Sequence, residues 1–146
     1  MGTLLDVPPL GFVRHDRRSP LTEPWEPLYS RRTGSAVVLG LHAGPVHTNS
    51  RGFVHGGLIG APADNAMGLS CAAALDRVGS LVTVNLSVDF LGTTQQDQWL
   101  EFRTEFVKPG GTLCFAQAFV TADGQPCARA NAIFCRLDGE RRKPQS

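Results

Sequence analysis

One stretch of the chain, from Asn49 to Gly68, combines residue types that can polarise a carbonyl group with one that can activate a nucleophile. Gly56 and Gly57 stand at the start of a predicted helix, where free backbone N–H groups and the lack of side chains suit an oxyanion or a carbonyl oxygen. Asp64 follows on the same predicted helix. Its carboxylate can take a proton from water or attack a carbonyl carbon directly. The pattern therefore indicates chemistry at a carbonyl group.

The spacing of these residues has a consequence for the assembly. Asp64 follows Gly56 by eight residues, which is about 12 Å along a helix at roughly 1.5 Å per residue. The two groups are therefore too far apart to touch one reacting carbon atom. Two such helices lying antiparallel about a twofold axis would bring each helix start to the partner's aspartate and create two equal shared sites. This chemistry requires a homodimer.

The helix that carries Asp64 is predicted to run from about Gly57 to near Gly79. Pro62 removes one backbone donor and clashes with the carbonyl group four residues earlier, so we expect a kink or a late helix start there. Small side chains along the helix allow a neighbouring sheet to approach its axis closely. The helical pattern rests on apolar or inward-facing residues at spacings of three and four, namely Leu58, Ala61, Asn65, Leu69, Ala72 and Leu75.

The rest of the chain reads mainly as strands. Residues 35–42 form a short β-branched run, and residues 82–90 alternate between an apolar and a polar face, with Thr83 on the polar one. Three more strands follow, joined by short turns and ending with residues 127–137, which predicts an antiparallel meander. Residues 1–34 form a proline-rich arm and first strand, and residues 140–146 form a solvated tail. The predicted class is α+β.

Composition excludes several kinds of protein. A chain of 146 residues with 42% hydrophobic and 18% charged residues predicts one domain, residues 1–146. A net charge of +1 argues against a nucleic acid or membrane partner. No signal-like or membrane-spanning run occurs, so we expect a cytoplasmic protein. Neither the cysteines nor the histidines have the spacing of metal ligands or disulfides, namely Cys71, Cys114, Cys127, Cys135, His15, His42, His47 and His55.

An ordered set of motifs resembles the hotdog-fold thioesterases, in particular the branch of the phenylacetic acid degradation (PaaI-like) thioesterases. The resemblance covers most of residues 35–137. Its fold would be a curved antiparallel sheet wrapped around a long central helix. The motifs that carry it are Pro45, His47, Asn49, Gly52, His55-Gly56-Gly57, Asp64-Asn65-Ala66-Met67-Gly68 and the strand from Thr83 to Leu91.

The resemblance implies hydrolysis of an acyl-coenzyme A thioester to the free acid and coenzyme A. Asp64 matches the catalytic general base or nucleophile, and Gly56 matches the backbone donor to the thioester carbonyl. Asn49 and His55 match polar residues beside that oxygen, and Thr83 matches a hydroxyl that helps to orient the water. Coenzyme A is part of the substrate, so neither a cofactor nor a metal is needed. The implied assembly is a homodimer, commonly paired into a homotetramer, and the implied substrate contacts are Gly57, Asn65 and Phe90.

The sequence departs from the family pattern at two places, and several alternative roles and functions stay open. Gly92-Thr93-Thr94 replaces a usual basic residue and proline after the strand, and Pro62 replaces a usual helix former. His55 and Asn49 also suit purely structural roles, as a backbone-bonded histidine and a turn residue. The same fold can support hydration or dehydration of acyl thioesters, or non-catalytic acyl-coenzyme A binding. Candidate contacts for coenzyme phosphates, none with a distinguishing spacing, are Arg14, Arg17, Arg18, Arg31, Arg32, Arg51 and Lys108.

Overall fold

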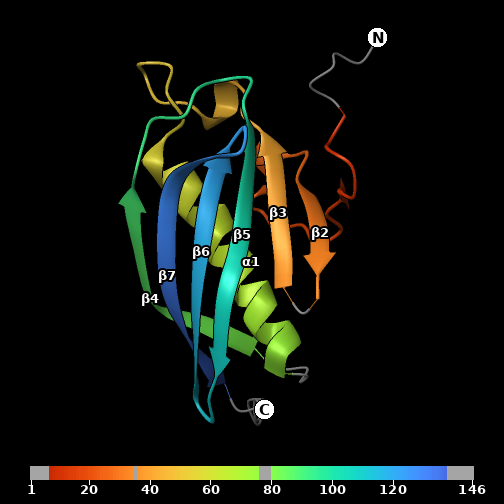
Figure 1. Cartoon of the computed structure of the whole chain (residues 1–146), viewed down its shortest axis with the longest axis vertical. Coiled ribbons are helices and arrows are strands. Elements are labelled where there is room, and N and C mark those ends of the chain that lie inside the picture. The colour runs from red at the N-terminus through yellow and green to blue at the C-terminus, as the bar shows by residue number, and fades with distance from the viewer. Residues whose placement is uncertain (1–6, 35, 76–79, 138–146) are drawn as a thin grey trace, which may run out of the picture.

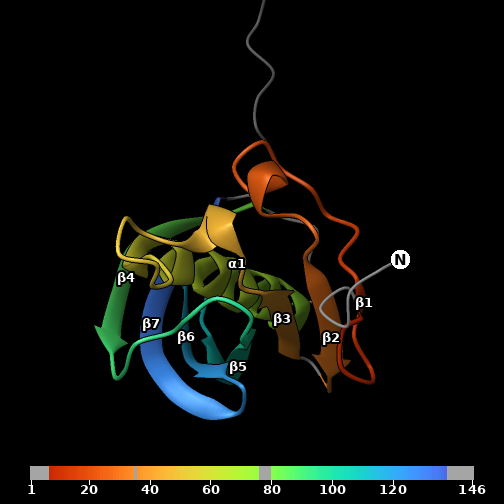
Figure 2. The same ribbon diagram turned by 90° about the horizontal axis from the view of Figure 1, so that it is seen from above.

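The computed structural model describes residues 7–34, 36–75 and 80–137. Its core is one seven-stranded sheet with the order β1-β2-β3-β5-β6-β7-β4, in which every neighbouring pair is antiparallel. The sheet curves around a single long helix, α1 (Gly56–Leu75), as Figures 1 and 2 show. The strands are β1 (Val13–Arg14), β2 (Tyr29–Thr33), β3 (Ala36–His42), β4 (Ser80–Phe90), β5 (Trp99–Pro109), β6 (Leu113–Ala122) and β7 (Gln125–Leu137). The predicted α+β hotdog architecture is confirmed. The predicted meander is wrong for its first strand, because β4 pairs with β7 and not with β5.

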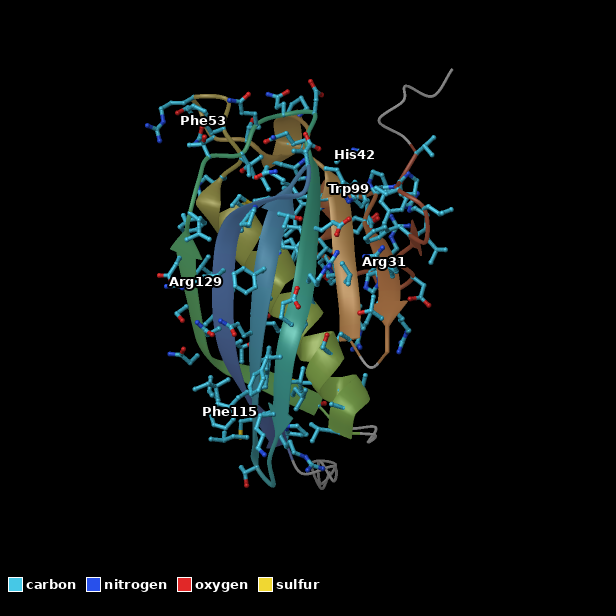
Figure 3. All side chains as sticks on the ribbon, viewed as in Figure 1. Arg31, His42, Phe53, Trp99, Phe115 and Arg129 are labelled. Carbon is cyan, nitrogen blue, oxygen red and sulfur yellow. The ribbon has the colours of Figure 1, made fainter. Side chains whose placement is uncertain are left out.

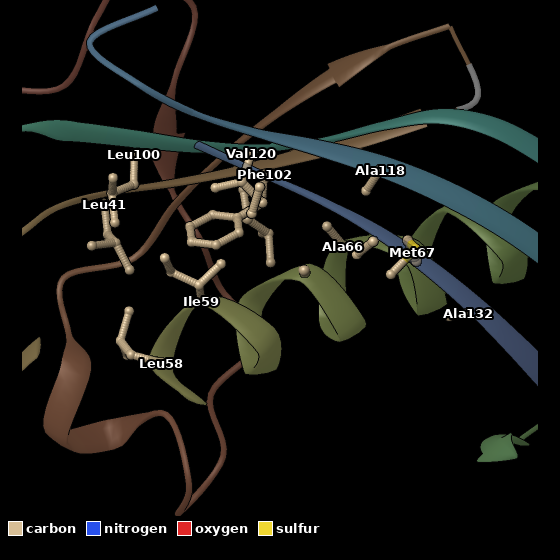
Figure 4. Packing of buried hydrophobic residues seen from close by; sticks show 14 of the residues in the cluster. Leu41, Leu58, Ile59, Ala66, Met67, Leu100, Phe102, Ala118, Val120 and Ala132 are labelled. Atoms are coloured by element: carbon tan, nitrogen blue, oxygen red, sulfur yellow. The ribbon is translucent and has the colours of Figure 1, made fainter. Parts of the chain in front are cut away.

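One face of α1 is packed against the sheet, and alanines keep the two close. Ala66 and Met67 are fully buried on this face and lie opposite Ala118 and Ala132 of the sheet (Figure 4). Small side chains on both surfaces shorten the distance at which the helix and the sheet can pack. The buried residues of α1 recur at the spacing of one helix face, namely Leu58, Ile59, Pro62, Ala63, Ala66, Met67, Ser70 and Cys71.

Pro62 does not delay the helix. α1 is helical from Gly56 through Pro62 to Leu75, so the predicted late start is wrong. A proline inside a helix removes a single N–H donor, and Pro62 is itself buried in the molecule. Packing of that face compensates for the lost bond. The predicted helix end near Gly79 falls among residues 76–79, outside the described residues.

A β-bulge in β4 changes the predicted faces of that strand. Thr83 lies opposite Phe134 and Asn85 opposite Ile133, so Val84 is an extra residue in β4. The bulge reverses the alternation at this point. Thr83 therefore shares the inward face with Leu86, whereas the sequence pattern had placed it on the opposite, polar face.

The N-terminal arm, residues 7–28, covers the side of α1 that the sheet leaves open. It forms the short strand β1, which pairs with β2, and then a 3-10 turn at Glu23–Trp25. Figure 2 shows this turn on the opposite side of α1 from β5, β6 and β7. On the outer face of the sheet a separate cluster surrounds Trp99, which contacts the ring of His42 (Figure 3). The arm thus adds a wall to the molecule next to α1.

Candidate active site

Asp64 and Thr83 form the centre of the candidate site. The Oγ1 hydroxyl of Thr83 donates a hydrogen bond of 2.7 Å to Oδ1 of Asp64. Asp64 lies in the middle of α1 and is half-buried, and Thr83 reaches it because the bulge in β4 turns its side chain inward. The bond fixes one carboxylate oxygen and leaves Oδ2 to accept a proton from another molecule.

A hollow of about 360 Å³ opens beside this pair. Asn65 and Gly68 line it from α1, and Leu81 and Phe134 line it from the sheet. Its opposite wall comes from the N-terminal arm. The residues of the arm that line it are His15, Arg17, Arg18, Ser19 and Thr22. Sequence reasoning had named only Arg17 and Arg18 as candidate contacts, for coenzyme phosphates. Their proline-rich context gave no signal for a site, because it predicts only an irregular segment.

The start of α1 is capped by a histidine side chain. Nδ1 of His55 accepts a hydrogen bond of 2.9 Å from the N–H of Gly57. The ring is therefore protonated on Nε2 when it is neutral. Within the described residues the N–H of Gly56 has no hydrogen-bond partner, so it is the free donor of the glycine pair. The structure thus gives His55 a capping role and leaves the N–H of Gly56 as the open donor.

The loop before the helix is held by Asn49. Its Oδ1 accepts hydrogen bonds from the N–H groups of Arg51 at 2.9 Å and of Phe53 at 3.2 Å. This is the geometry of an Asx turn, in which the side chain replaces a backbone acceptor. Asn49 therefore shapes the loop, and only its Nδ2 group is left to face a substrate. A contact between Asn49 and a substrate stays a prediction.

Phe90 lies over the start of α1 at the far end of β4. A Cβ atom added to Gly56 would come within 3.1 Å of the Phe90 ring. The predicted site residues thus fall into two groups in one chain. Asp64, Asn65 and Thr83 line the hollow, whereas the rest lie at the helix start, namely Asn49, His55, Gly56, Gly57 and Phe90.

Two histidines near the site are kept neutral by their surroundings. Burial lowers the pKa of His47. Nδ1 of His47 accepts a 2.8 Å bond from the N–H of Gly44 and so holds the loop ahead of Asn49. Burial also lowers the pKa of His15 in the arm, and Asp16 and Glu26 partly oppose the shift. Both imidazoles therefore favour the uncharged form.

The cysteines behave as core residues. All four are free thiols, and Cys71 and Cys114 are fully buried. Burial raises the pKa of the Cys127 thiol to about 11, so this group stays protonated at neutral pH. Cys71, Cys114 and Cys127 are buried, and Cys135 is partly buried. In the parts of the chain that the structure describes, no three His, Cys, Asp or Glu side chains cluster as metal ligands would.

The fold and the carboxylate beside a hollow define a class of enzymes that act on thioesters. A model of the thioesterase superfamily matches residues 51–128. A Pseudomonas aeruginosa protein provisionally named an esterase is 32% identical over 127 residues, covering 86% of this chain and 95% of the relative. The chain belongs to the thioesterase superfamily and is a thioester hydrolase.

Solved structures support the fold. A thioesterase family protein from Silicibacter pomeroyi is 27% identical with a TM-score of 0.75, over 83% of this chain and 91% of that one. A mutant of the phenylacetic acid degradation protein PaaI from Thermus thermophilus is 21% identical with a TM-score of 0.72, over 82% and 100%. A hypothetical thioesterase from Streptococcus pneumoniae, solved with coenzyme A, is 23% identical with a TM-score of 0.71, over 80% and 93%. The predicted resemblance to hotdog thioesterases is confirmed.

The described helices give one further result. Among residues 7–34, 36–75 and 80–137, no helix combines the length and the hydropathy needed to cross a membrane. The predicted cytoplasmic location and the predicted lack of a cofactor stay predictions.

Proposed function

We propose that the protein hydrolyses acyl-coenzyme A thioesters, with Asp64 as general base or nucleophile. The observation that carries the proposal is the Thr83–Asp64 hydrogen bond of 2.7 Å at the edge of the hollow. It orients the carboxylate and leaves Oδ2 open toward the space that an acyl group would occupy. An oriented carboxylate beside a substrate-sized space is what general-base catalysis needs.

The chemistry follows two routes from this arrangement. As a base, Asp64 takes a proton from a water molecule whose oxygen attacks the thioester carbonyl carbon. As a nucleophile, its Oδ2 attacks the same carbon and forms an anhydride that water then hydrolyses. In both routes the carbon–sulfur bond breaks, the thiolate takes up a proton, and the products are the free acid and coenzyme A. A backbone N–H aimed at the carbonyl oxygen stabilises the negative charge that develops there.

We propose that this N–H is that of Gly56 of the partner subunit in a homodimer. Gly56 and Asp64 of one chain lie about 12 Å apart on α1. β4 is an edge strand, and its apolar side chains are unusually open for a sheet, with exposed fractions of 54% for Val84 and 55% for Phe90. An exposed apolar edge strand is a template for pairing with another strand.

The contacts within one chain indicate how two β4 strands would pair. Thr83 contacts Asp64 near one end of β4, and Phe90 covers Gly56 at the other end. Antiparallel pairing about a twofold axis near Leu86 would bring Thr83 of one subunit beside the partner's Phe90. The same pairing would bring Asp64 beside the partner's Gly56, so each dimer would hold two complete sites. We extend the proposal to a homotetramer built from two such dimers.

The His55 contact supports hydrolysis over hydration of the thioester. Its Nδ1 is occupied by the N–H of Gly57, so the ring is tied to the helix start as a cap. Coenzyme A as the thiol part of the substrate is supported by the neighbour of the same fold that was solved with coenzyme A. The proposed reaction uses no bound cofactor.

A substrate panel tests the proposal. Purified protein is incubated with short aliphatic, long aliphatic and aromatic acyl-coenzyme A esters, and the free thiol released is measured. We expect turnover of at least one ester, and a rate lower by about 10²- to 10⁴-fold for the Asp64→Asn variant. An absence of thiol release from every ester, with acyl-coenzyme A binding retained, would identify a non-catalytic binding module. Loss of an enoyl thioester's absorbance without thiol release would identify a hydratase.

A further inference from the structure

We propose that the acyl group bears a carboxylate at the end remote from the thioester, and that Arg17 and Arg32 bind it. This inference rests on the proposed hydrolysis at Asp64, and it names the substrate class of that site. The N-terminal arm closes the hollow beside Asp64 and joins this hollow to a second one.

The hollow beside Asp64 suits a small acyl group. Its volume of about 360 Å³ is near the lower end of the range of roughly 300–1,000 Å³ for small-molecule sites. Leu28, Leu39 and Phe134 supply apolar walls, and Asp64 and Thr83 lie on one side. A thioester carbonyl at Asp64 would therefore direct its acyl chain along these walls toward the arm.

A second hollow of about 450 Å³ adjoins the first. The two share His15, Arg17 and Leu69 as lining residues, so their junction lies where the arm crosses the later part of α1. Arg32 of β2 lines the second hollow. An acyl chain that passes Asp64 and follows α1 thus leads to a hollow lined by four arginines, namely Arg14, Arg17, Arg31 and Arg32.

Among the arginines of this region, Arg17 and Arg32 are those whose guanidinium groups have neither a polar nor an aromatic partner within the described residues. Within the described residues neither has an ion pair or a hydrogen bond from its side chain. The other nearby arginines are occupied, since Arg14 pairs with Glu26 at 3.3 Å and Arg18 pairs with Glu23 at 2.6 Å. A guanidinium group without a partner is suited to a bidentate carboxylate.

Strand alternation separates Arg32 from its neighbour Arg31. The Arg31 guanidinium lies 4.8 Å from the centre of the Phe12 ring, in the cluster on the outer face of the sheet. Adjacent residues of a strand point to opposite faces, so Arg32 faces the side that carries α1. The acidic residue Asp16 lines the same hollow, and the two arginines leave an excess of positive charge there.

Distance favours an acyl carboxylate over a coenzyme phosphate as the anion. Leu69, at the junction of the hollows, follows Asp64 by five residues, about 7.5 Å along the helix. The pantetheine arm places about thirteen bonds between the sulfur and the first phosphate, roughly 15 Å when extended. A phosphate would pass beyond the junction, whereas the end of a short dicarboxylic half-thioester would reach it.

The test compares acyl groups of similar length with and without the charge. Initial rates are measured with adipoyl-coenzyme A, its monomethyl ester and hexanoyl-coenzyme A, for the wild type and for Arg17→Gln and Arg32→Gln. We expect the wild type to prefer the free carboxylate. Each substitution should lower kcat/KM for adipoyl-coenzyme A roughly 10- to 100-fold, as expected for a lost hydrogen bond to a charged group. The rates with the two uncharged esters should stay within about twofold. Arg103→Gln is the matched control, because Arg103 pairs with Glu101 away from the hollows.

Several outcomes would overturn the inference. Equal losses of kcat/KM for charged and uncharged acyl groups would show that the arginines do not bind the carboxylate at the end of the acyl group. Equal losses for all coenzyme A esters, with none for the corresponding N-acetylcysteamine thioesters, would assign the arginines to coenzyme phosphates. If no ester is hydrolysed the proposed function fails, and equilibrium binding then decides this inference separately. In that experiment the Asp64→Asn protein must bind adipoyl-coenzyme A more tightly than hexanoyl-coenzyme A, and Arg17→Gln must remove the difference.

Discussion

At the scale of residues, the proposed chemistry depends on a single hydrogen bond, from Thr83 to Asp64. Asp64→Asn removes the basic oxygen, and we expect kcat to fall by about 10²- to 10⁴-fold. Thr83→Val removes the donor that orients the carboxylate, and we expect a smaller fall of about tenfold, whereas Thr83→Ser keeps the hydroxyl and most of the activity. Steady-state thiol release measures all three variants, and circular dichroism checks their folding. A Thr83→Val enzyme with wild-type kcat would contradict the orienting role of this bond.

The N–H of Gly56 can be removed without breaking the helix. Gly56 is the first residue of α1, where proline is tolerated because its missing donor is not needed there. We expect Gly56→Pro to lower kcat by about 10²- to 10³-fold, as for other losses of a backbone donor to a developing oxyanion. Gly56→Ala is the matched control, since it keeps the N–H and adds only a Cβ atom 3.1 Å from the exposed Phe90 ring. Equal losses in the two variants would point to crowding of Phe90 instead of the N–H.

Some candidate site residues could be predicted from the sequence, and others were left undecided. Gly56 and Asp64 follow from spacing alone, because a free helix start and a carboxylate on one helix have distinct chemistry. His55 had two interpretations, and its bond to the Gly57 N–H favours the structural one. Arg17 was one of several equivalent arginines in the sequence. Its position depends on the path of the arm, which local patterns do not specify.

At the scale of elements, Ser70 joins α1 to the sheet. Its hydroxyl accepts a 3.0 Å bond from the N–H of Val37 in β3 and donates a 2.7 Å bond to the carbonyl of Ala66. Ser70→Ala would leave the Val37 N–H buried without a partner. We expect a loss of about 1–3 kcal/mol in the free energy of unfolding, measured by urea titration. Thr33→Ala at the exposed end of β2 is the control and should change it by less than about 0.5 kcal/mol.

The loop before α1 gives a prediction about acid sensitivity. Burial lowers the pKa of His47 in the folded protein, so below the ordinary value the unfolded chain binds more protons than the folded one. The stabilisation is therefore complete above about pH 6.5 and is lost as the pH falls through the lower folded pKa. We expect His47→Asn, which can still accept a bond from the Gly44 N–H, to reduce the loss of stability between pH 7.5 and 5.5. Urea midpoints at these pH values measure it, and an unchanged pH dependence would count against this role.

The elements show where sequence patterns succeed and where packing decides. Strict alternation correctly located β4 but assigned Thr83 to the wrong face, because a bulge adds one residue without any signature in its side chains. Pro62 suggested a late helix start, yet its burial in the folded molecule outweighs the loss of one backbone bond. Both differences come from tertiary contacts. Local preferences alone do not include them.

At the scale of the whole molecule, the sheet order supports the proposal that two chains complete each site. β4 follows α1 in the sequence but pairs with β7 at the edge of the sheet, which leaves one side of β4 open. The arm instead covers the opposite part of α1 and closes the hollow from its own chain. Each chain would thus build its own acyl hollow and depend on a partner for the carbonyl donor.

This division predicts complementation between two inactive proteins. Asp64→Asn lacks the base and Gly56→Pro lacks the donor, so neither homodimer has a working site. If Asp64 and Gly56 act from different subunits, each mixed dimer has one intact site and one doubly defective site. Co-expression in equal amounts makes about half of the dimers mixed, so we expect about a quarter of the wild-type thiol release. Different affinity tags allow the mixed dimer to be isolated, and it should reach about half of the wild-type rate. An inactive mixed dimer would show that the two residues do not share a site across the interface.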